Sequence, residues 1–427
     1  MSNQEIIRRR RFCQIISEIT GTTQYLVVGI DIGKETHHAF MGTAAGISLF
    51  RKLIFENNLD GFRKLMETAD LIKRQNGLRE IVYGLEPTGN YHKPLARHLI
   101  QCDCHVVLVA GQAVSNNRQL IDGRWDKHDT KDAANVADLI SRGKCLYYDS
   151  PSSEITDLRA LLSLRRRLKK EEQRLSMRIR NNLIAQHFPE LDRFYSACES
   201  EGLAIVRMCL DPNEIAGMEF DDFFRLVAKG RRGVAQDLRL SKIHQLAIES
   251  IGCPMGHAAE HEARLLVEKL DQIRRQIEKN DDLMEDICLE FPEYSFLLSI
   301  PGFGRYISAV VLAAIADPFR FKTRNQVLKM SGYDLSAIRS GKSSAKAVPV
   351  ISKKGKGELR YALYQAAKVA SSRTALFRRY FAKILSGRER EKGIITKMRV
   401  KLAAKLLVIA WTLMKNKEVF DPAHIHI

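Results

Sequence analysis

The sequence contains no apolar run long enough to span a bilayer and no cysteine pair spaced for zinc. Its longest apolar stretches, such as LLVIAWTLM at 406–414, are far shorter than the roughly 20 residues that a membrane helix needs. The basic start, IIRRRRFCQIISEIT, lacks the unbroken apolar segment of a signal peptide. The 8 cysteines include no CxxC pair, which favours reduced thiols in a cytoplasmic protein. We therefore expect a protein with no membrane association and no structural zinc.

Acidic residues are scarce relative to basic ones. The 427 residues include 68 Lys and Arg against 50 Asp and Glu, which gives a net charge of +18. A large positive net charge favours binding to a polyanionic partner. Nucleic acid is the preferred candidate, and an acidic membrane surface is the second. A charge excess that serves only solubility is the alternative. The length itself indicates about two or three domains.

The pattern of apolar residues divides the chain into four parts. Residues 1–24 are interpreted as a basic N-terminal arm. Residues 25–150 alternate strand and helix signals, which is typical of an α/β sheet domain. Residues 151–290 are helical, and residues 291–427 are predicted to form a helical C-terminal domain. The predicted fold class is therefore α/β followed by all-α.

The region 151–290 has two features of its own. A helical stretch contains a block of five cations that would contact phosphates without reading sequence, namely Arg165, Arg166, Arg167, Lys169 and Lys170. Further along, mostly apolar residues recur at alternating intervals of four and three positions: Leu266, Leu270, Ile273, Ile277, Asn280, Met284 and Ile287. This spacing predicts a heptad seam in which Asn280 sets the register. We expect a helical arm or antiparallel coiled coil, and an ordinary pair of bundled helices is the alternative.

Acidic residues stand where apolar strands end. The strand YLVVGID ends in Asp31, and the strand IVYGLE ends in Glu86. Because burying an unpartnered carboxylate is costly, such groups usually bind a metal ion or pair with a cation. Asp129 and Asp132 lie three residues apart at the start of a helix and therefore share one face. Four carboxylates favour Mg²⁺ or Mn²⁺, and two such ions would clamp the oxygens of a phosphodiester.

Other interpretations of the acidic motif are weaker. A strand that ends in Asp-Ile-Gly also opens sugar-kinase and actin-like ATPase domains, but those folds need a second glycine-rich phosphate loop, which this sequence lacks. Three histidines near the acids, His37, His38 and His128, are interpreted as surface or supporting residues rather than metal ligands.

The C-terminal region contains a glycine turn and a basic serine loop. Pro301 and Gly302 make a tight turn, and Gly304 would let backbone N–H groups approach a phosphate at the next helix. This arrangement is typical of a helix-hairpin-helix motif, and a plain turn at the start of a helix is the alternative. The later stretch SAIRSGKSSAK contains the pair Ser340-Gly341. Its cations are Arg339, Lys342 and Lys346, and the serines that compete with Ser340 as nucleophile are Ser336, Ser343, Ser344 and Ser352.

Motifs in both halves of the chain resemble one family. VGIDIGK, GLEPTGNY and KHDTKDAANVADLI resemble the RuvC-like DEDD domain of the insertion-sequence one-ten transposases, whose relatives include the pilin-gene invertases. PGFGRYISAVVLAAIADPFRF and SGYDLSAIRSGKSSAKAVPVISKKGKGELRYAL resemble the second conserved domain of that family. The resemblance covers nearly the whole chain, and the order of the two halves makes it more specific than either motif.

The resemblance implies a RuvC-like (RNase H-like) N-terminal domain and a DNA recombinase with a composite site. The four acids, Asp31, Glu86, Asp129 and Asp132, would hold Mg²⁺ or Mn²⁺, and Ser340 would attack the DNA phosphate. It also implies that an RNA encoded beside the gene guides the choice of donor and target DNA. We expect a homo-oligomer (dimer or tetramer) in the bacterial cytoplasm, associated with the nucleoid. A site-specific DNA invertase and a nucleic-acid-binding regulator without cleavage activity are the alternatives.

Overall fold

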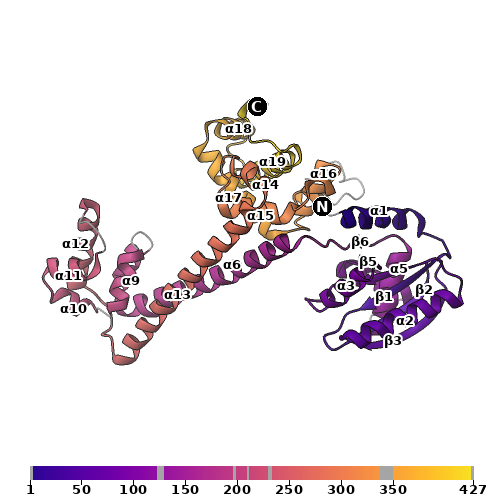
Figure 1. Cartoon of the computed structure of the whole chain (residues 1–427). Helices are drawn as coiled ribbons and strands as arrows, with labels where there is room; N and C mark the ends of the chain where they lie inside the picture. The colour runs from indigo at the N-terminus through magenta and orange to yellow at the C-terminus, as the bar shows by residue number, and fades with distance from the viewer. Residues whose placement is uncertain are drawn as a thin grey trace. The chain divides into compact units, whose positions relative to one another are not determined.

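The chain folds as two compact units, Met1–Pro151 and Ser152–Ile427 (Figure 1). The computed structural model describes residues 3–122, 129–195, 199–208, 211–228, 233–336 and 350–424. The first unit is mixed α/β, and the second is almost entirely helical. The expectation of an α/β domain followed by a helical remainder is confirmed at this level.

A six-stranded sheet with the order β3-β2-β1-β4-β5-β6 forms the centre of the first unit. The elements of this unit are α1 (Asn3–Glu18), β1 (Tyr25–Asp31), β2 (Thr36–Thr43), β3 (Ser48–Glu56), α2 (Leu59–Gln75), β4 (Glu80–Leu85), α3 (His92–Gln101), β5 (His105–Leu108), α4 (Gly111–Asp122), α5 (Asp129–Ser141) and β6 (Leu146–Tyr147). Strands β1, β4 and β5 are parallel, whereas β2, β3 and β6 run antiparallel to their neighbours.

Alternation along the strands divides the first unit into two faces. Val28 and Ile30 of β1 pack with α2 and α3 on one face. Val27 packs with α1 and α5 on the other face. Because successive side chains of a strand point to opposite sides, Gly29 and Asp31 belong to the face that carries α5.

Two glycines allow α5 to approach the sheet closely. Gly29 of β1 and Gly84 of β4 are partners in the parallel register. A Cβ atom on Gly29 would lie 2.1 Å from the carbonyl oxygen of Ala133, and one on Gly84 would lie 1.9 Å from Cδ1 of Ile140. Both contacted residues belong to α5. The helix therefore rests on the bare backbone of β1 and β4, where a side chain would displace it.

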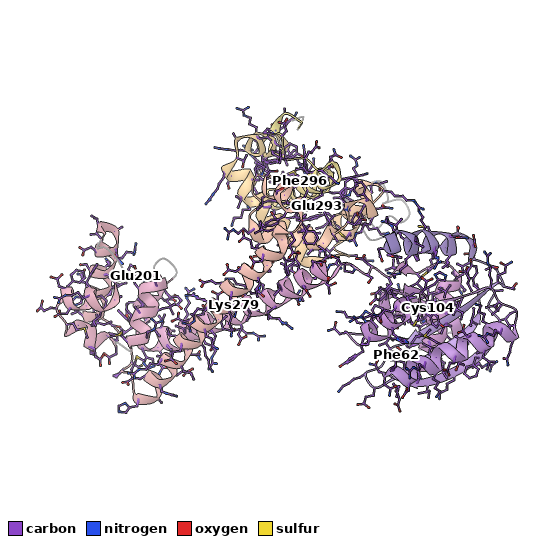
Figure 2. All side chains as sticks on the ribbon, viewed as in Figure 1. Phe62, Cys104, Glu201, Lys279, Glu293 and Phe296 are labelled. Atoms are coloured by element: carbon purple, nitrogen blue, oxygen red, sulfur yellow. The ribbon has the colours of Figure 1, made fainter. Side chains whose placement is uncertain are left out.

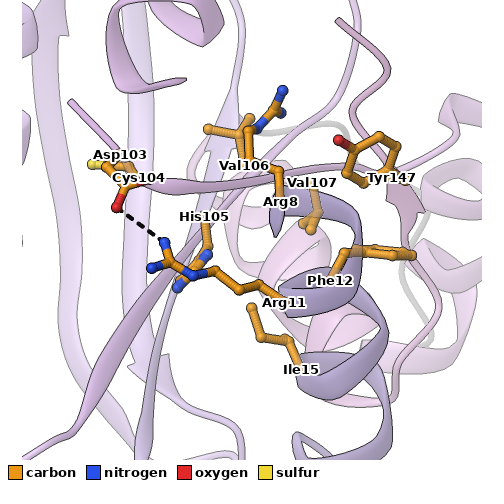
Figure 3. A pocket seen from close by; sticks show the side chains of 10 residues that line it. All are labelled: Arg8, Arg11, Phe12, Ile15, Asp103, Cys104, His105, Val106, Val107 and Tyr147. Atoms are coloured by element: carbon orange, nitrogen blue, oxygen red, sulfur yellow. Dashed lines mark hydrogen bonds and ion pairs between the residues drawn. The ribbon is translucent and has the colours of Figure 1, made fainter. Parts of the chain in front are cut away.

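Most of the N-terminal basic segment forms the helix α1, which packs on the sheet. Ile15 and Ile19 are buried on the sheet face that also carries α5. Figure 3 shows α1 facing β5, with Arg11 donating to the carboxylate of Asp103 at 3.0 Å. Apolar residues four positions apart give the segment a buried stripe, which explains why it folds onto the sheet.

The second unit consists of helices and one short strand pair. Its elements are α6 (Ser153–Arg178), η1 (Ile179–Ile184), α7 (Ala185–His187), η2 (Pro189–Leu191), α8 (Asp192–Tyr195), α9 (Glu199–Met208), α10 (Pro212–Ala216), α11 (Phe220–Val227), α12 (Val234–Ile248), α13 (His257–Leu289), α14 (Pro292–Leu298), α15 (Arg305–Ile315), η3 (Pro318–Arg320), α16 (Arg324–Ser331), β7 (Leu335–Ser336), β8 (Val350–Ile351), α17 (Gly357–Arg373), α18 (Ala375–Leu385), α19 (Ile394–Asn416) and η5 (Pro422–His424).

Two hydrophobic cores lie at opposite ends of the pair formed by α6 and α13. Helices α14 to α19 build one core with Leu158 of α6. Helices α9 to α12 build the other core with Leu175 of α6. Figure 2 labels Phe296 at the first core, Glu201 at the second, and Lys279 on the helix pair between them.

Helices α6 and α13 run antiparallel to each other. Arg165 donates to Asp281 at 2.6 Å, whereas Arg178, later in α6, donates to Glu262, earlier in α13, at 3.3 Å. The predicted seam lies in this contact: Leu266, Leu270, Ile273, Ile277, Asn280 and Met284 are buried, and Ile287 is partly buried. Asn280 donates to the backbone carbonyl of Leu161 at 3.4 Å, which ties the seam to the facing helix.

The close approach of α5 predicts that Gly29→Ala destabilises the first unit by about 3 kcal/mol, at the upper end of the usual cost of overpacking. Gly84→Ala should cost less, because its Cβ meets the end of the Ile140 side chain rather than backbone. Gly256→Ala, in the second unit, is the control for a glycine whose Cβ would meet nothing within 4 Å; as the N-cap of α13 it should cost only about 1 kcal/mol. Denaturant unfolding with amide hydrogen exchange of β1 and α5 measures the difference. Equal stability of the Gly29→Ala and Gly256→Ala proteins would contradict this packing.

Candidate active site

The ends of β1 and β4 bring Asp31 and Glu86 to one edge of the sheet. Ile30 pairs with Leu85, and the backbone N–H of Glu86 donates to the carbonyl of Ile30 at 3.3 Å. The two acidic residues therefore leave neighbouring strands at the same level. Each lies two positions beyond one of the paired glycines, so both belong to the face that carries α5.

Helix α5 brings further carboxylates to this edge. Ala133 touches β1 at Gly29, so the first turn of α5 lies beside the strand end that carries Asp31. Asp132, the residue before Ala133, is 1% exposed. Asp129 is the first residue of α5, and its side chain lies outside the described residues.

Glu86 lies against the start of α4. A Cβ atom on Gly111, the first residue of α4, would lie 3.0 Å from Oε1 of Glu86. The missing side chain of Gly111 therefore leaves room for the carboxylate. The N-terminus of a helix also carries partial positive charge, which favours an anion at this position.

Asp132 is paired with Arg118 of α4. Nε and Nη2 of Arg118 donate to the same atom, Oδ1 of Asp132, at 2.9 and 2.7 Å. The Asp132 side chain is 2% exposed and that of Arg118 is 24% exposed. In this structure a cation from the protein itself therefore compensates the charge of the buried carboxylate.

Buried amides extend the contact between α4 and α5. Asn117 donates to Asn135 at 2.8 Å and to Asp138 at 2.7 Å. Asn135 in turn donates to the carbonyl of Val114 at 2.7 Å. This polar network holds α4 beside α5 and so keeps Arg118 within reach of its partner. Sequence reasoning missed α4 and its residues, because the stretch GQAVSNNRQLID has only weak apolar spacing.

The acidic edge supplies the kind of oxygen donors that a divalent cation prefers. Asp31, Glu86 and Asp132 supply the hard oxygen donors that Mg²⁺ and Mn²⁺ prefer. Within the described ranges, however, no three side chains of the His, Cys, Asp or Glu type are close enough together to hold a metal ion. In the part of α5 that is described, Asp132 is bound by Arg118 instead.

His37 supports the turn that follows Asp31. It is a buried supporting residue rather than a surface one, with an exposed fraction of 0%. Its Nδ1 accepts the backbone N–H of Gly33 at 3.3 Å, and its ring stacks on Phe62, with centroids 6.4 Å apart. Burial lowers the pKa of His37, which keeps the ring neutral and able to accept this bond.

The segment predicted to carry the nucleophile is flanked by the short strands β7 and β8 of the second unit. Residues 337–349 lie outside the described residues and include Ser340, Arg339, Lys342 and Lys346. Ser336 and Val350, which flank them, pair in the antiparallel ladder of β7 and β8. Below the ladder, Ser352 donates its hydroxyl to Asp334 at 2.5 Å. This bond joins Ser352, just after β8, to Asp334, just before β7.

The two glycines of the PGFG turn have different surroundings. Gly302 has a φ of +92°, and a Cβ atom there would lie 2.6 Å from the carbonyl oxygen of Ala366 in α17. Packing against α17 thus explains this glycine without any ligand. Gly304 precedes α15, and a Cβ atom there would meet nothing within 4 Å. Of the two predicted phosphate contacts, only Gly304 has open space around it.

Two family models match the chain in the regions that contain these features. A model of the DEDD type, described as "Transposase", matches residues 28–189, which include all four predicted acids. A second model, described as "Transposase IS116/IS110/IS902 family", matches residues 294–382, which include the Ser340 loop. The chain belongs to this family of transposases. The comparison with curated proteins found no match.

Membership of the family confirms the resemblance found in the sequence, and it makes DNA of a mobile element the substrate class. Among the described helices of this transposase, none has both the length and the apolar character needed to cross a membrane.

The basic block on α6 of the transposase is not uniform. Arg165 donates to both carboxylate oxygens of Asp281, at 2.6 and 3.0 Å, and its guanidinium lies 4.2 Å from the ring centre of Tyr306. Lys169 pairs with Glu172 at 2.8 Å. The other members of the block, Arg166, Arg167 and Lys170, are exposed. Arg165 therefore joins α6 to α13 and α15, and the exposed members are the better candidates for phosphate contacts.

This difference predicts opposite outcomes for neighbouring arginines. Arg165→Ala should destabilise the helical unit by about 2 kcal/mol, because it removes charge-assisted hydrogen bonds to a partly buried partner. Arg167→Ala should change stability by less than about 0.5 kcal/mol but weaken nucleic-acid binding at low salt. Thermal unfolding and salt-dependent binding titrations separate the two effects. Equal stability of the two variants would contradict the structural role of Arg165.

Proposed function

We propose that this transposase cuts and rejoins the DNA of a mobile element at a RuvC-like, metal-dependent site. The supporting observation is the placement of Asp31, Glu86 and Asp132 at one edge and one face of the sheet, within the region that matches the DEDD transposase family. The strand order, with parallel β1, β4 and β5 extended by antiparallel β2 and β3, supports the RuvC-like assignment.

The acidic residues Asp31, Glu86, Asp129 and Asp132 would hold Mg²⁺ or Mn²⁺. A bound ion of this type neutralises the phosphate oxygens and stabilises the attacking and leaving oxygens of a displacement. The residues around the acids have positioning roles. His37 holds the turn after Asp31, and Gly111 makes room for the Glu86 carboxylate. The buried network between α4 and α5 keeps Asp132 in place.

The proposal predicts that Asp31→Asn, Glu86→Gln and Asp132→Asn each reduce DNA cleavage by about 10²- to 10³-fold in Mg²⁺. Nucleic-acid binding should change little, because phosphate contacts come from basic surfaces. Glu67→Gln is the control, because this carboxylate is exposed on α2, which packs on the opposite face of the sheet. Nicking of a supercoiled plasmid that carries the element's ends measures cleavage. Unreduced cleavage by the Asp31→Asn protein would exclude the metal site.

Ser340 is the proposed nucleophile. Its Oγ would form a bond to phosphorus while the P–O bond to the departing strand breaks, which leaves the DNA joined to the protein. Three features support this choice. Gly341 gives a DNA strand room to pass, the nearby Arg339, Lys342 and Lys346 supply positive charge, and the Ser-Gly pair stands where the resembled family keeps its nucleophile.

We therefore expect Ser340→Ala to abolish the covalent protein–DNA adduct, whereas Ser343→Ala and Ser344→Ala keep it. The hydroxyl is the only group of Ser340 that can form the phosphoester, so alanine removes the intermediate itself. Trapping the adduct on a cleaved substrate and mapping the modified peptide identifies the residue. An adduct at another serine, or cleavage without an adduct, would refute the assignment.

The proposal also includes a guide RNA encoded by the element and a homo-oligomer (dimer or tetramer). The exposed cations of α6, Arg166, Arg167 and Lys170, support contact with a nucleic-acid backbone of any sequence. A site-specific invertase would use the same residues on a different DNA substrate. A regulator without cleavage activity would bind the element's ends but leave the plasmid intact, so the nicking assay distinguishes it from the enzyme.

A further inference from the structure

We propose that Arg118 is the counterion that a divalent cation must displace from Asp132, so that metal binding at the acidic edge exchanges one cation for another. This inference rests on the proposed function, because it takes Asp132 as a metal ligand. It assigns a positioning role to a residue of α4 that stands outside the four acids.

The geometry of the pair makes Arg118 a direct competitor of a metal ion. Two of its nitrogen atoms donate to Oδ1 of Asp132, at 2.9 and 2.7 Å. A metal ion and a guanidinium both require the lone pairs of the carboxylate oxygens. Because Asp132 is 2% exposed, solvent cannot compensate its charge, and one of the two cations has to do so.

The two partners differ in their freedom to move. Asp132 precedes Ala133, whose carbonyl is pressed against β1 at Gly29, so α5 cannot shift without disturbing the sheet. Arg118 is 24% exposed, and its long side chain can turn toward solvent while α4 stays in place. The exchange therefore moves the arginine and leaves the carboxylate where it is.

The pair with Arg118 keeps Oδ1 of Asp132 from serving as a metal ligand in this structure. The described residues contain no group of three potential ligands close enough to hold a metal ion. Departure of the guanidinium removes a positive charge that repels the incoming ion. It also frees the lone pairs of the Oδ1 atom for the metal ion.

Titration of the full-length protein with Mn²⁺, followed by calorimetry in the absence of nucleic acid, tests the inference. Arg118→Ala should bind Mn²⁺ at least about tenfold more tightly than the unchanged protein, because no charge-assisted hydrogen bond has to be broken. Arg118→Lys keeps the charge with fewer donors and should lie between the two. Arg142→Ala is the matched control: Arg142, the residue that follows α5, pairs with Asp138 of that helix at 3.0 Å, and its loss should leave Mn²⁺ affinity unchanged.

Unchanged or weaker Mn²⁺ binding by Arg118→Ala would overturn the inference. If thermal unfolding shows that Arg118→Ala does not fold, the comparison passes to Arg118→Lys, for which affinity at or below that of the unchanged protein has the same meaning. The Asp31→Asn protein tests the underlying metal site separately. Equal Mn²⁺ binding with and without Asp31 refutes the proposed site, whereas loss of binding in Asp31→Asn without tightening in Arg118→Ala refutes only the role of Arg118.

Discussion

The contact of α5 with the bare backbone of β1 and β4 is the constraint on which the first unit depends. Gly29 and Gly84 lie side by side in the sheet, and the helix fills the space that their side chains would occupy. The same two strands end in acidic residues two positions later. The helix that packs on the glycines therefore brings its own acidic first turn to the edge where Asp31 and Glu86 emerge, so one packing interaction assembles the candidate site.

The structure compensates the charges of two acids at this edge by different means. Asp132 is paired with a guanidinium, and Glu86 lies at the positive end of a helix. His37 stays neutral, because burial lowers its pKa. These arrangements hold the acids in place before any substrate or metal ion binds, and they leave the edge open to exchange of one cation for another.

The high net charge of +18 is only partly available to a nucleic acid. In the helical unit several cations serve the fold itself. The carbonyl of Ala313 near the end of α15 accepts from Arg159 at 2.9 Å, and that of Ala314 accepts from Arg320 at 2.9 Å and from Lys356 at 3.2 Å. Such cations compensate the negative end of the helix dipole. The phosphate-binding surface therefore has to be sought among exposed cations without such partners.

The sequence by itself determined what depends on short-range periodicity. The strand ends at Asp31 and Glu86 and the buried positions of α13 were predicted, because alternation and heptad spacing are visible within one segment. Only the tertiary structure decided which charges meet. Arg118 with Asp132 and Arg165 with Asp281 join separate helices, and no local pattern marks such partners. The physical reason is that an ion pair depends on where whole elements pack, and here that packing is set by glycine contacts and an antiparallel seam.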